Sequence, residues 1–157
     1  MNISDILTQE RTFADLKCAS KKRTLETISH LLGHQMINLD GKELFNALIN
    51  RERLGSTGFG DGIAIPHCRL ANCTQVTGGL VRLAQAIDFD AIDEQPVDLL
   101  FVLLVPTQAT NEHLQILATD EHLQILATLA EHFGNLEFRT RLRNAIDADA
   151  MYKIAIA

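Results

Sequence analysis

Residues 52 to 68, Glu52-Arg-Leu-Gly-Ser-Thr-Gly-Phe-Gly-Asp-Gly-Ile-Ala-Ile-Pro-His-Cys68, form the most unusual stretch of the sequence. Its four glycines are typical of a loop whose backbone closely approaches a ligand or another segment. Ile63-Ala-Ile65 predicts a short strand leading out of this loop. Pro66 cannot donate a hydrogen bond to a sheet, so we expect the strand to fray or to lie at a sheet edge there, with His67 at the strand end.

The segments on either side of this stretch predict helices and strands. Apolar residues with helical spacing run from Ser20 to about Gly33, and again after Asp40-Gly-Lys-Glu43, which has the spacing of a capping box, to about Arg53. Further along, the pattern predicts strands at 76–83 and 99–105, with Ile87-Asp-Phe89 as a possible short strand, and helices at 110–132, 135–146 and 147–154. This order predicts a mixed sheet covered by helices on both faces.

Length, composition and charge place the chain among ordinary globular proteins. Its 157 residues suit a single domain spanning 1–157, and its net charge of −6 argues against a nucleic-acid partner, which would need a clustered basic surface. The first residues lack the pattern of a signal peptide, and no apolar run is long enough for a membrane span. Three cysteines without a CxxC pair agree with a reducing compartment, so we expect a cytoplasmic protein without membrane insertion.

A nine-residue tandem duplication occupies residues 112–128. Glu112-His-Leu-Gln-Ile-Leu-Ala-Thr119 recurs unchanged as Glu121-His-Leu-Gln-Ile-Leu-Ala-Thr128. In a continuous helix, nine residues turn the chain through about 900°, so the two copies would lie on opposite faces. The apolar positions that continue downstream are Leu123, Leu126, Leu129, Ala130 and Phe133, so we expect the second copy to hold the packed register and the first to be an extension or a loop.

His67 has surroundings that suit a phosphoryl acceptor. A neutral imidazole nitrogen at a strand end can act as a nucleophile, and the amides of Ser56, Thr57, Gly58 and Gly60 could cradle phosphate oxygens. Arg51 and Arg53 are the nearest candidate cations for stabilising the transferred charge. On spacing alone, a histidine satisfied within the fold remains an alternative.

The stretch from Glu52 to Cys68 resembles the phosphorylation-site signature of the mannitol/fructose class of IIA phosphotransferase domains. The matching positions are the acidic Glu52, Phe59-Gly60, Ile63-Ala-Ile-Pro-His67 and the small Cys68. Downstream, Phe89-Asp-Ala-Ile-Asp-Glu-Gln-Pro-Val-Asp-Leu-Leu-Phe-Val-Leu-Leu-Val-Pro106 is similar to the nitrogen-regulatory branch of that class. The similarity covers nearly the whole chain.

This resemblance implies an α+β domain with three α/β/α layers and a mixed sheet. It also implies a phosphohistidine at His67, formed from an HPr-like phosphocarrier protein (NPr) that is charged from phosphoenolpyruvate, with Arg51 beside it. In the family a second histidine faces the first, and the duplication offers two candidates. His113 keeps the spacing from Pro106 and His122 keeps the downstream helix register; we favour His122, since lengthening a surface loop costs less than a slip within a packed helix.

The resemblance favours a regulatory phosphocarrier whose phosphorylation state controls target proteins, with Phe59 on the contact surface. The protein would then transfer phosphoryl groups through a phosphohistidine intermediate and would not turn over a substrate by itself. We expect no cofactor, and a monomer or weak dimer. A sugar-specific IIA component that passes phosphate to a IIB domain, and an interaction module that is never phosphorylated, are the alternatives.

Two other groups of residues contain potentially reactive side chains. His30 and His34 lie one helical turn apart but lack a third ligand, so no metal site is expected. Cys68 adjoins His67, but neighbours along a strand point to opposite faces, which disfavours a thiol and imidazole couple.

Overall fold

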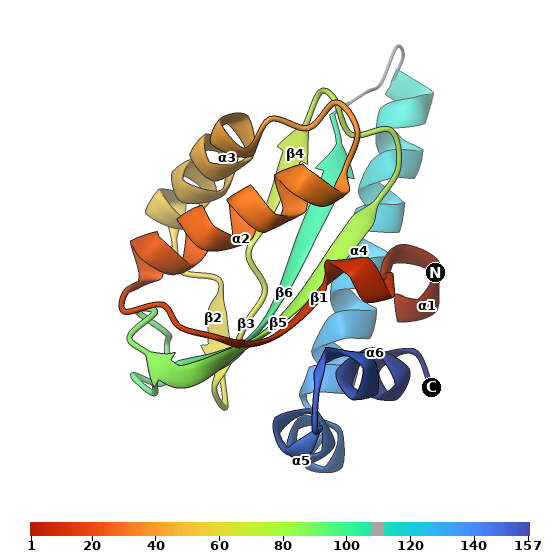
Figure 1. Ribbon diagram of the computed structural model, residues 1–157. Coiled ribbons are helices and arrows are strands. Elements are labelled where there is room, and N and C mark those ends of the chain that lie inside the picture. Colours follow the sequence, from red (N-terminus) through yellow and green to blue (C-terminus); the bar gives the residue numbers. More distant parts are fainter. Residues whose placement is uncertain (108–111) are drawn as a thin grey trace.

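The computed structural model (Figure 1) describes the backbone of residues 1–107 and 112–157 and the side chains of 1–107 and 123–157. The strands are β1 (Thr12–Leu16), β2 (Gly58–Gly60), β3 (Ile63–Ala64), β4 (His67–Leu70), β5 (Thr77–Ile87) and β6 (Val97–Pro106). The helices are α1 (Ile3–Ile6), α2 (Lys21–Gln35), α3 (Gly41–Leu54), α4 (Glu112–Phe133), α5 (Leu136–Asn144) and α6 (Ala148–Ile156), with a 3₁₀ turn, η1, at Gln9–Arg11.

The strands form a mixed sheet in the order β1-β5-β6-β3-β2. β5 and β6 are antiparallel, as are β2 and β3, whereas β1 runs parallel to β5 and β3 runs parallel to β6. β4 also pairs in parallel with β6, further along the strand than β3. β3 and β4 therefore occupy successive parts of the same edge of β6.

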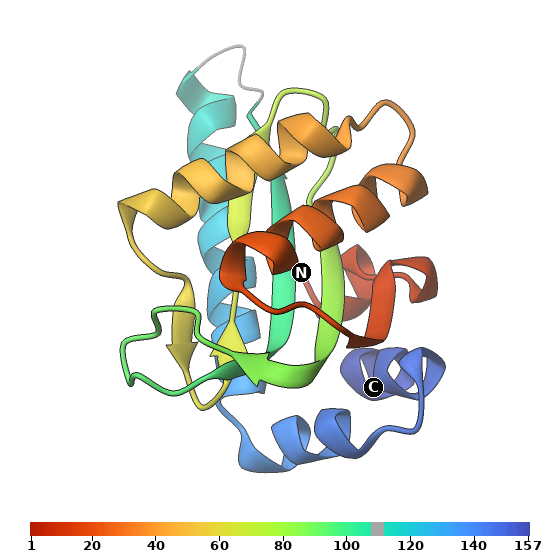
Figure 2. The ribbon, with the colours of Figure 1, turned by 60° about the vertical axis from the view of Figure 1, so that its left-hand side comes forward.

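Helices cover both faces of this sheet (Figures 1 and 2). α2 and α3 lie over one face, and α1, α4, α5 and α6 lie over the other. β6 contributes alternate residues to the two cores: Leu100, Val102 and Leu104 pack under α2 and α3, while Leu99, Phe101, Leu103 and Val105 pack on the opposite side. This arrangement confirms the predicted three-layer fold and the strand buried on both faces.

Local sequence signals place the two helices next to the glycine-rich stretch. Ser20 caps α2 by accepting a hydrogen bond from the Arg23 amide, and Asp40 caps α3 by accepting one from the Lys42 amide at 2.9 Å. The capping box predicted at Asp40 does not form, because Asp40 caps the Lys42 amide and not that of Glu43, while the Glu43 carboxylate accepts a hydrogen bond from the Asn72 side chain. Both helices nevertheless begin where their caps predict.

The structure differs from the sequence-based expectations around the sheet edge and at the N-terminus. The predicted glycine-rich loop contains β2. The strand after it ends at Ala64, before Pro66, as expected, but the chain resumes pairing at His67 as β4, which among the described strands pairs only with β6. Residues 87–89 form no separate strand, since β5 ends at Ile87. α1 and β1 were not predicted from the sequence.

Both copies of the duplication lie within α4, so the first copy extends the helix. From the second copy onward, Ile125, Leu129 and Phe133 are fully buried and Leu126 is partly buried, which confirms that this copy packs in the core. Leu123 was wrongly predicted to join that face: it is 60% exposed. It precedes Ile125 by two residues, about 200° around the helix, which turns it to solvent.

No helix among the described residues is both long and apolar enough to cross a membrane. Within the same part of the chain, no cluster of three or more histidine, cysteine or acidic side chains is arranged to hold a metal ion. Cys18, Cys68 and Cys73 are free thiols.

Candidate functional site

His67 is positioned by an interruption in the edge of the sheet. Pro66 has no N–H group and separates β3 from β4, while its carbonyl accepts a hydrogen bond from the Leu103 amide of β6 at 2.9 Å. His67 follows as the first residue of β4 and pairs with Leu103. The backbone that carries the half-buried imidazole is therefore held by the central strand.

The imidazole of His67 is oriented by a hydrogen bond to its own backbone. Nδ1 lies 2.8 Å from the carbonyl oxygen of Ile65. Because a carbonyl oxygen can only accept, Nδ1 carries the proton in the neutral ring and the lone pair is on Nε2. Burial lowers the pKa of His67 below 6.5, opposed by the Ile65 bond, and the charge of Arg51 lowers it further. The ring is therefore neutral, and nucleophilic at Nε2, at pH 7.

Arg51 projects from the last turn of α3, where its Nη1 donates to the carbonyl of Gly55 at 2.9 Å. Its positive charge is a further cause, after burial, of the lowered pKa of His67, which follows it by sixteen positions in the sequence. Arg53, the other cation considered, instead bonds to the Asn50 side chain at 3.2 Å. Arg51 is thus the better placed of the two arginines.

The loop after α3 uses its polar groups to hold its own shape. The amide and the hydroxyl of Thr57 both donate to the Glu52 carboxylate, and the Gly58 amide donates to Ser56 Oγ at 3.0 Å. Ser56 Oγ itself donates to the Phe89 carbonyl at 2.8 Å. The amides of Thr57 and Gly58 are therefore already bonded within the loop in this structure.

Gly60 lies apart from the other residues predicted to cradle phosphate. It pairs with Ile63, at the end of β3 that is remote from His67. Four residues of extended chain span about 13 Å, so the structure does not bring Gly60 next to the imidazole. Thr57 is closer, because its carbonyl accepts a hydrogen bond from the Ile65 amide at 3.0 Å. The side chains of His113 and His122 lie outside the described residues.

An ion pair beside the loop was not foreseen from the sequence. Lys21 Nζ lies 2.8 Å from Glu52 Oε2, whose side chain is 2% exposed, and also 4.7 Å from the centre of the Phe89 ring. A carboxylate in the last turn of a helix is disfavoured by the helix dipole, and this was the sequence signal that Glu52 has a tertiary partner. Only the folded structure shows that this partner of Glu52 is Lys21.

Cys68 takes no part in the chemistry of His67. It is buried in the core under α2 and α3, and burial raises the pKa of its thiol to about 12. A thiol with so high a pKa is a poor nucleophile. The expectation that the two neighbours point to opposite faces of the strand agrees with this burial.

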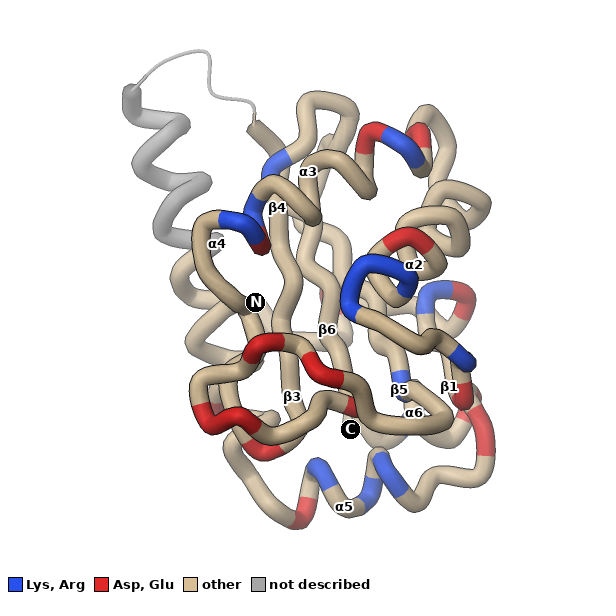
Figure 3. The backbone as a smooth tube through the Cα atoms, turned by 90° about the vertical axis from the view of Figure 1, so that its left-hand side faces the viewer, with Lys and Arg blue, Asp and Glu red and all other residues tan. Residues whose placement is uncertain are grey.

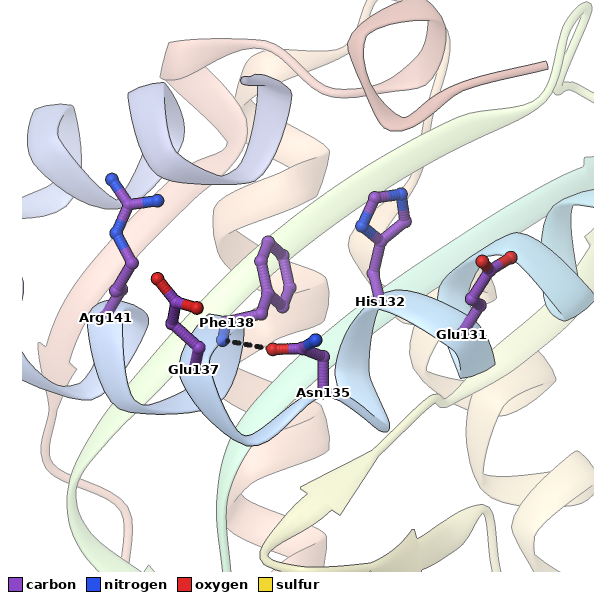
Figure 4. A pocket seen from close by; sticks show the side chains of 6 residues that line it. All are labelled: Glu131, His132, Asn135, Glu137, Phe138 and Arg141. Carbon is purple, nitrogen blue, oxygen red and sulfur yellow. Dashed lines mark hydrogen bonds between the residues drawn. The ribbon is translucent and has the colours of Figure 1, made fainter.

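A separate polar hollow lies where α4 meets α5 (Figure 4). Its volume is about 350 Å³, and it is lined by Glu131, His132, Asn135, Glu137, Phe138 and Arg141. The dashed bond in Figure 4 is the helix cap of α5, in which Asn135 accepts from the Phe138 amide. None of the predicted site residues lines this hollow, so we base no function on it.

Comparison with known proteins places this geometry in a family. Residues 5–119 match the family described as "Phosphoenolpyruvate-dependent sugar phosphotransferase system, EIIA 2". A nitrogen regulatory protein of Pseudomonas aeruginosa is 45% identical over 156 residues, which cover 99% of this chain and 96% of that protein. The crystal structure of nitrogen regulatory protein IIA-Ntr from Neisseria meningitidis superposes with a TM-score of 0.83 at 37% identity, covering 98% of each chain.

The fold extends to more distant structures. IIA mannitol from Escherichia coli superposes with a TM-score of 0.72 at 18% identity, covering 95% of this chain and 98% of the other, which shows a shared fold. The sequence identity to the nitrogen regulatory proteins is far higher and spans almost the full length of both chains. The chain therefore belongs to the EIIA 2 family of the phosphoenolpyruvate-dependent sugar phosphotransferase system and, within it, groups with the nitrogen regulatory proteins.

Proposed function

We propose that the protein is a regulatory phosphocarrier that accepts a phosphoryl group on Nε2 of His67. The observation that carries this proposal is the 2.8 Å bond between Nδ1 and the Ile65 carbonyl, which places the lone pair of the neutral ring on Nε2. Transfer forms the Nε2–P bond as the bond between phosphorus and the donor breaks. Nδ1 keeps its proton and donates it to the Ile65 carbonyl, and this hydrogen bond stabilises the positive charge of the phosphorylated ring.

Arg51 is proposed to stabilise the transferred charge. Its guanidinium already lowers the pKa of His67, and the same charge would attract the phosphoryl oxygens during transfer. Because the amides of Thr57 and Gly58 are bonded within the loop, we assign that loop chiefly to holding the site in shape. A second histidine, His122 in preference to His113, remains part of the proposal.

The donor would be an HPr-like phosphocarrier protein (NPr), docking on exposed apolar side chains beside the loop. Leu54, Phe59 and Ile92 are 85%, 41% and 88% exposed. Phe59 and Ile92 lie on adjacent segments, because the Asp61 amide after β2 donates to the Asp93 carboxylate at 3.0 Å. Acidic residues surround this part of the loop between β5 and β6 (Figure 3), so the surface suits a partner with a basic rim.

Phosphorylation would control the binding of target proteins. A phosphoryl group adds a charge of about −1.5 to −2 to a half-buried neutral ring, which favours one set of partners over another. Free cysteines agree with a protein that works in the cytoplasm. The whole chain would act as one domain, as a monomer or weak dimer.

The proposal is tested by labelling with radioactive phosphoenolpyruvate and the cognate carrier proteins. We expect acid-labile, base-stable label on the wild type, none on His67→Ala, and full label on His30→Ala, which removes an exposed histidine of α2. An unlabelled wild type or a labelled His67→Ala would refute it. Rapid discharge to a IIB domain and sugar would support the sugar-specific alternative instead.

The docking surface is tested separately. Phe59→Ala should raise the KM for the phosphorylated donor more than it lowers kcat, since it weakens encounter and leaves the imidazole unchanged. Ile37→Ala is the matched control, because Ile37 is 91% exposed in the turn between α2 and α3. Equal KM values for the two variants would refute this surface.

A further inference from the structure

A continuous path of polar contacts links the first turn of α2 to the imidazole of His67. It begins at the ion pair between Lys21 and Glu52, which is 2.8 Å long and nearly closed to solvent on the Glu52 side. Lys21 comes from α2 and Glu52 from the end of α3, so the pair fixes the two helices relative to each other beside the loop. Phe89, under the ammonium group, also accepts the hydrogen bond of Ser56 through its carbonyl.

Glu52 in turn holds Thr57 in place. Its carboxylate accepts from both the amide and the hydroxyl of Thr57, which is only 8% exposed. Two donors on one residue fix both the backbone and the side chain of Thr57. The direction of the Thr57 carbonyl is set as a consequence.

Thr57 in turn fixes the group that orients the imidazole. Its carbonyl accepts from the Ile65 amide at 3.0 Å, and the Ile65 carbonyl accepts from His67 Nδ1 at 2.8 Å. Pro66 follows Ile65 and restricts Ile65 to extended conformations, while its own ring fixes φ near −65°. Little freedom therefore remains between Thr57 and the imidazole.

Packing alone does not explain a buried ion pair at this place. Pairs of this kind contribute little net stability, since apolar side chains of the same volume often serve as well. The charged pair fixes the orientation of the Glu52 carboxylate, which contacts Lys21 and accepts hydrogen bonds from the amide and the hydroxyl of Thr57. An apolar pair would leave the two Thr57 donors without an acceptor.

We propose that Lys21, Glu52 and Thr57 are positioning residues for His67, which hold the Ile65 carbonyl so that the imidazole keeps its proton on Nδ1 and presents Nε2 to the phosphoryl donor. The inference rests on the proposed function for the role of Nε2. Lys21 and Thr57 act on the reaction through the orientation of the ring, whereas the charge of Glu52 also acts on the imidazole directly.

The test measures the tautomer of His67 and the rate of phosphorylation in the same variants. Thr57→Val removes the hydroxyl at nearly constant shape, Thr57→Ser restores it, and Glu52→Gln keeps an acceptor oxygen without the charge. Glu26→Gln, which removes a carboxylate from the surface pair with Arg23, is the control. Nitrogen chemical shifts of histidine-labelled protein give the tautomer, and the His67→Ala spectrum assigns the signals.

We expect Thr57→Val and Glu52→Gln to lower the ratio of the Nδ1–H to the Nε2–H form, and the phosphorylation rate, by about threefold to tenfold, the effect of one hydrogen bond. For Thr57→Ser, the tautomer ratio and the phosphorylation rate should both lie within about twofold of the wild-type values. For Glu26→Gln, both should equal the wild-type values. Unchanged tautomer ratios in both Thr57→Val and Glu52→Gln would overturn the inference, as would changed ratios with unchanged rates. The tautomer measurement needs no donor, so it decides the inference even if the wild type takes no label, a result that would remove only the proposed function.

Discussion

Replacing Glu52 with alanine should destabilise the protein by about 3 kcal/mol, at the lower end of the range for breaking a buried ion pair. The change leaves the amide and hydroxyl of Thr57 without their acceptor in a position closed to water, at about 1 kcal/mol each. Lys21 loses its nearest partner but is 17% exposed and lies 3.6 Å from the Asp90 carboxylate, which limits its share to about 1 kcal/mol.

Urea unfolding followed by circular dichroism measures this loss. With a slope of about 2 kcal/mol per molar urea, the midpoint should fall by about 1.5 M with the slope unchanged. Glu26→Ala is the matched control on α2, since its 3.8 Å contact with Arg23 is exposed and contributes at most about 0.5 kcal/mol. The double variant Lys21→Met/Glu52→Gln should recover more than half of the loss, because it leaves no unpaired charge.

The reasoning fails if Glu52→Ala moves the urea midpoint no further than Glu26→Ala does. It also fails if the neutral double variant is as unstable as Glu52→Ala, because the loss would then not come from unpaired groups. If the dependence of the unfolding free energy on urea concentration changes in Glu52→Ala, the variant has altered the compactness of the folded or the unfolded state. The free energies of the two variants can then not be compared.

Three further outcomes are expected from urea unfolding. Leu129→Ala should cost about 2–5 kcal/mol and Leu123→Ala under about 0.5, and equal losses would contradict the register of α4. Gly62→Ala should cost about 2 kcal/mol or more, because φ is +81° and the new Cβ would overlap Arg143 Nη2; a neutral result would contradict that contact. The folded pKa of His67 is lowered, so the unfolded chain binds more protons between that pKa and about 6.5, and stability falls as the pH drops through this window. His67→Gln should remove this part of the pH dependence; an unchanged profile would refute it.

The elements that the sequence predicted well are those determined by neighbouring residues. α2 and α3 begin at their capping residues, Ser20 and Asp40, and their apolar stripes face the sheet. β6 was recognisable because an unbroken apolar run suits a strand covered on both faces. In each case the signal lies within the element itself.

β1 and β4 were missed because their pairing partners are distant in the sequence. Thr12 pairs with Leu80, and Asp15 takes a positive φ of 58°, which breaks the local strand pattern. Pro66 correctly indicates a break in the strand, but nothing near it indicates that the chain pairs again with β6 from His67 onward. Long-range pairing of this kind leaves no periodic trace in a short segment.

At the candidate site, the chemistry-bearing residues were easier to predict than their supports. The resemblance indicated His67 and Arg51, and in the structure burial and then the charge of Arg51 lower the pKa of His67. It could not show that the loop amides of Thr57 and Gly58 bond inward, because a sequence does not reveal which way an amide points. The pairing of Lys21 with Glu52 likewise depends on how two helices pack.

The pairing of β1 with β5 also sets an order on folding during synthesis. β1 is made early, but its neighbour in the sheet, which includes Leu80 opposite Thr12, is translated several seconds later at about 5–20 residues per second. Until then β1 has no neighbouring strand to pair with, and β6, which pairs with the other side of β5, is made later still. β1 therefore leaves the ribosome before β5 but is fixed in the sheet only after β5 is made, and until then α2 and α3 lack the sheet surface that they cover.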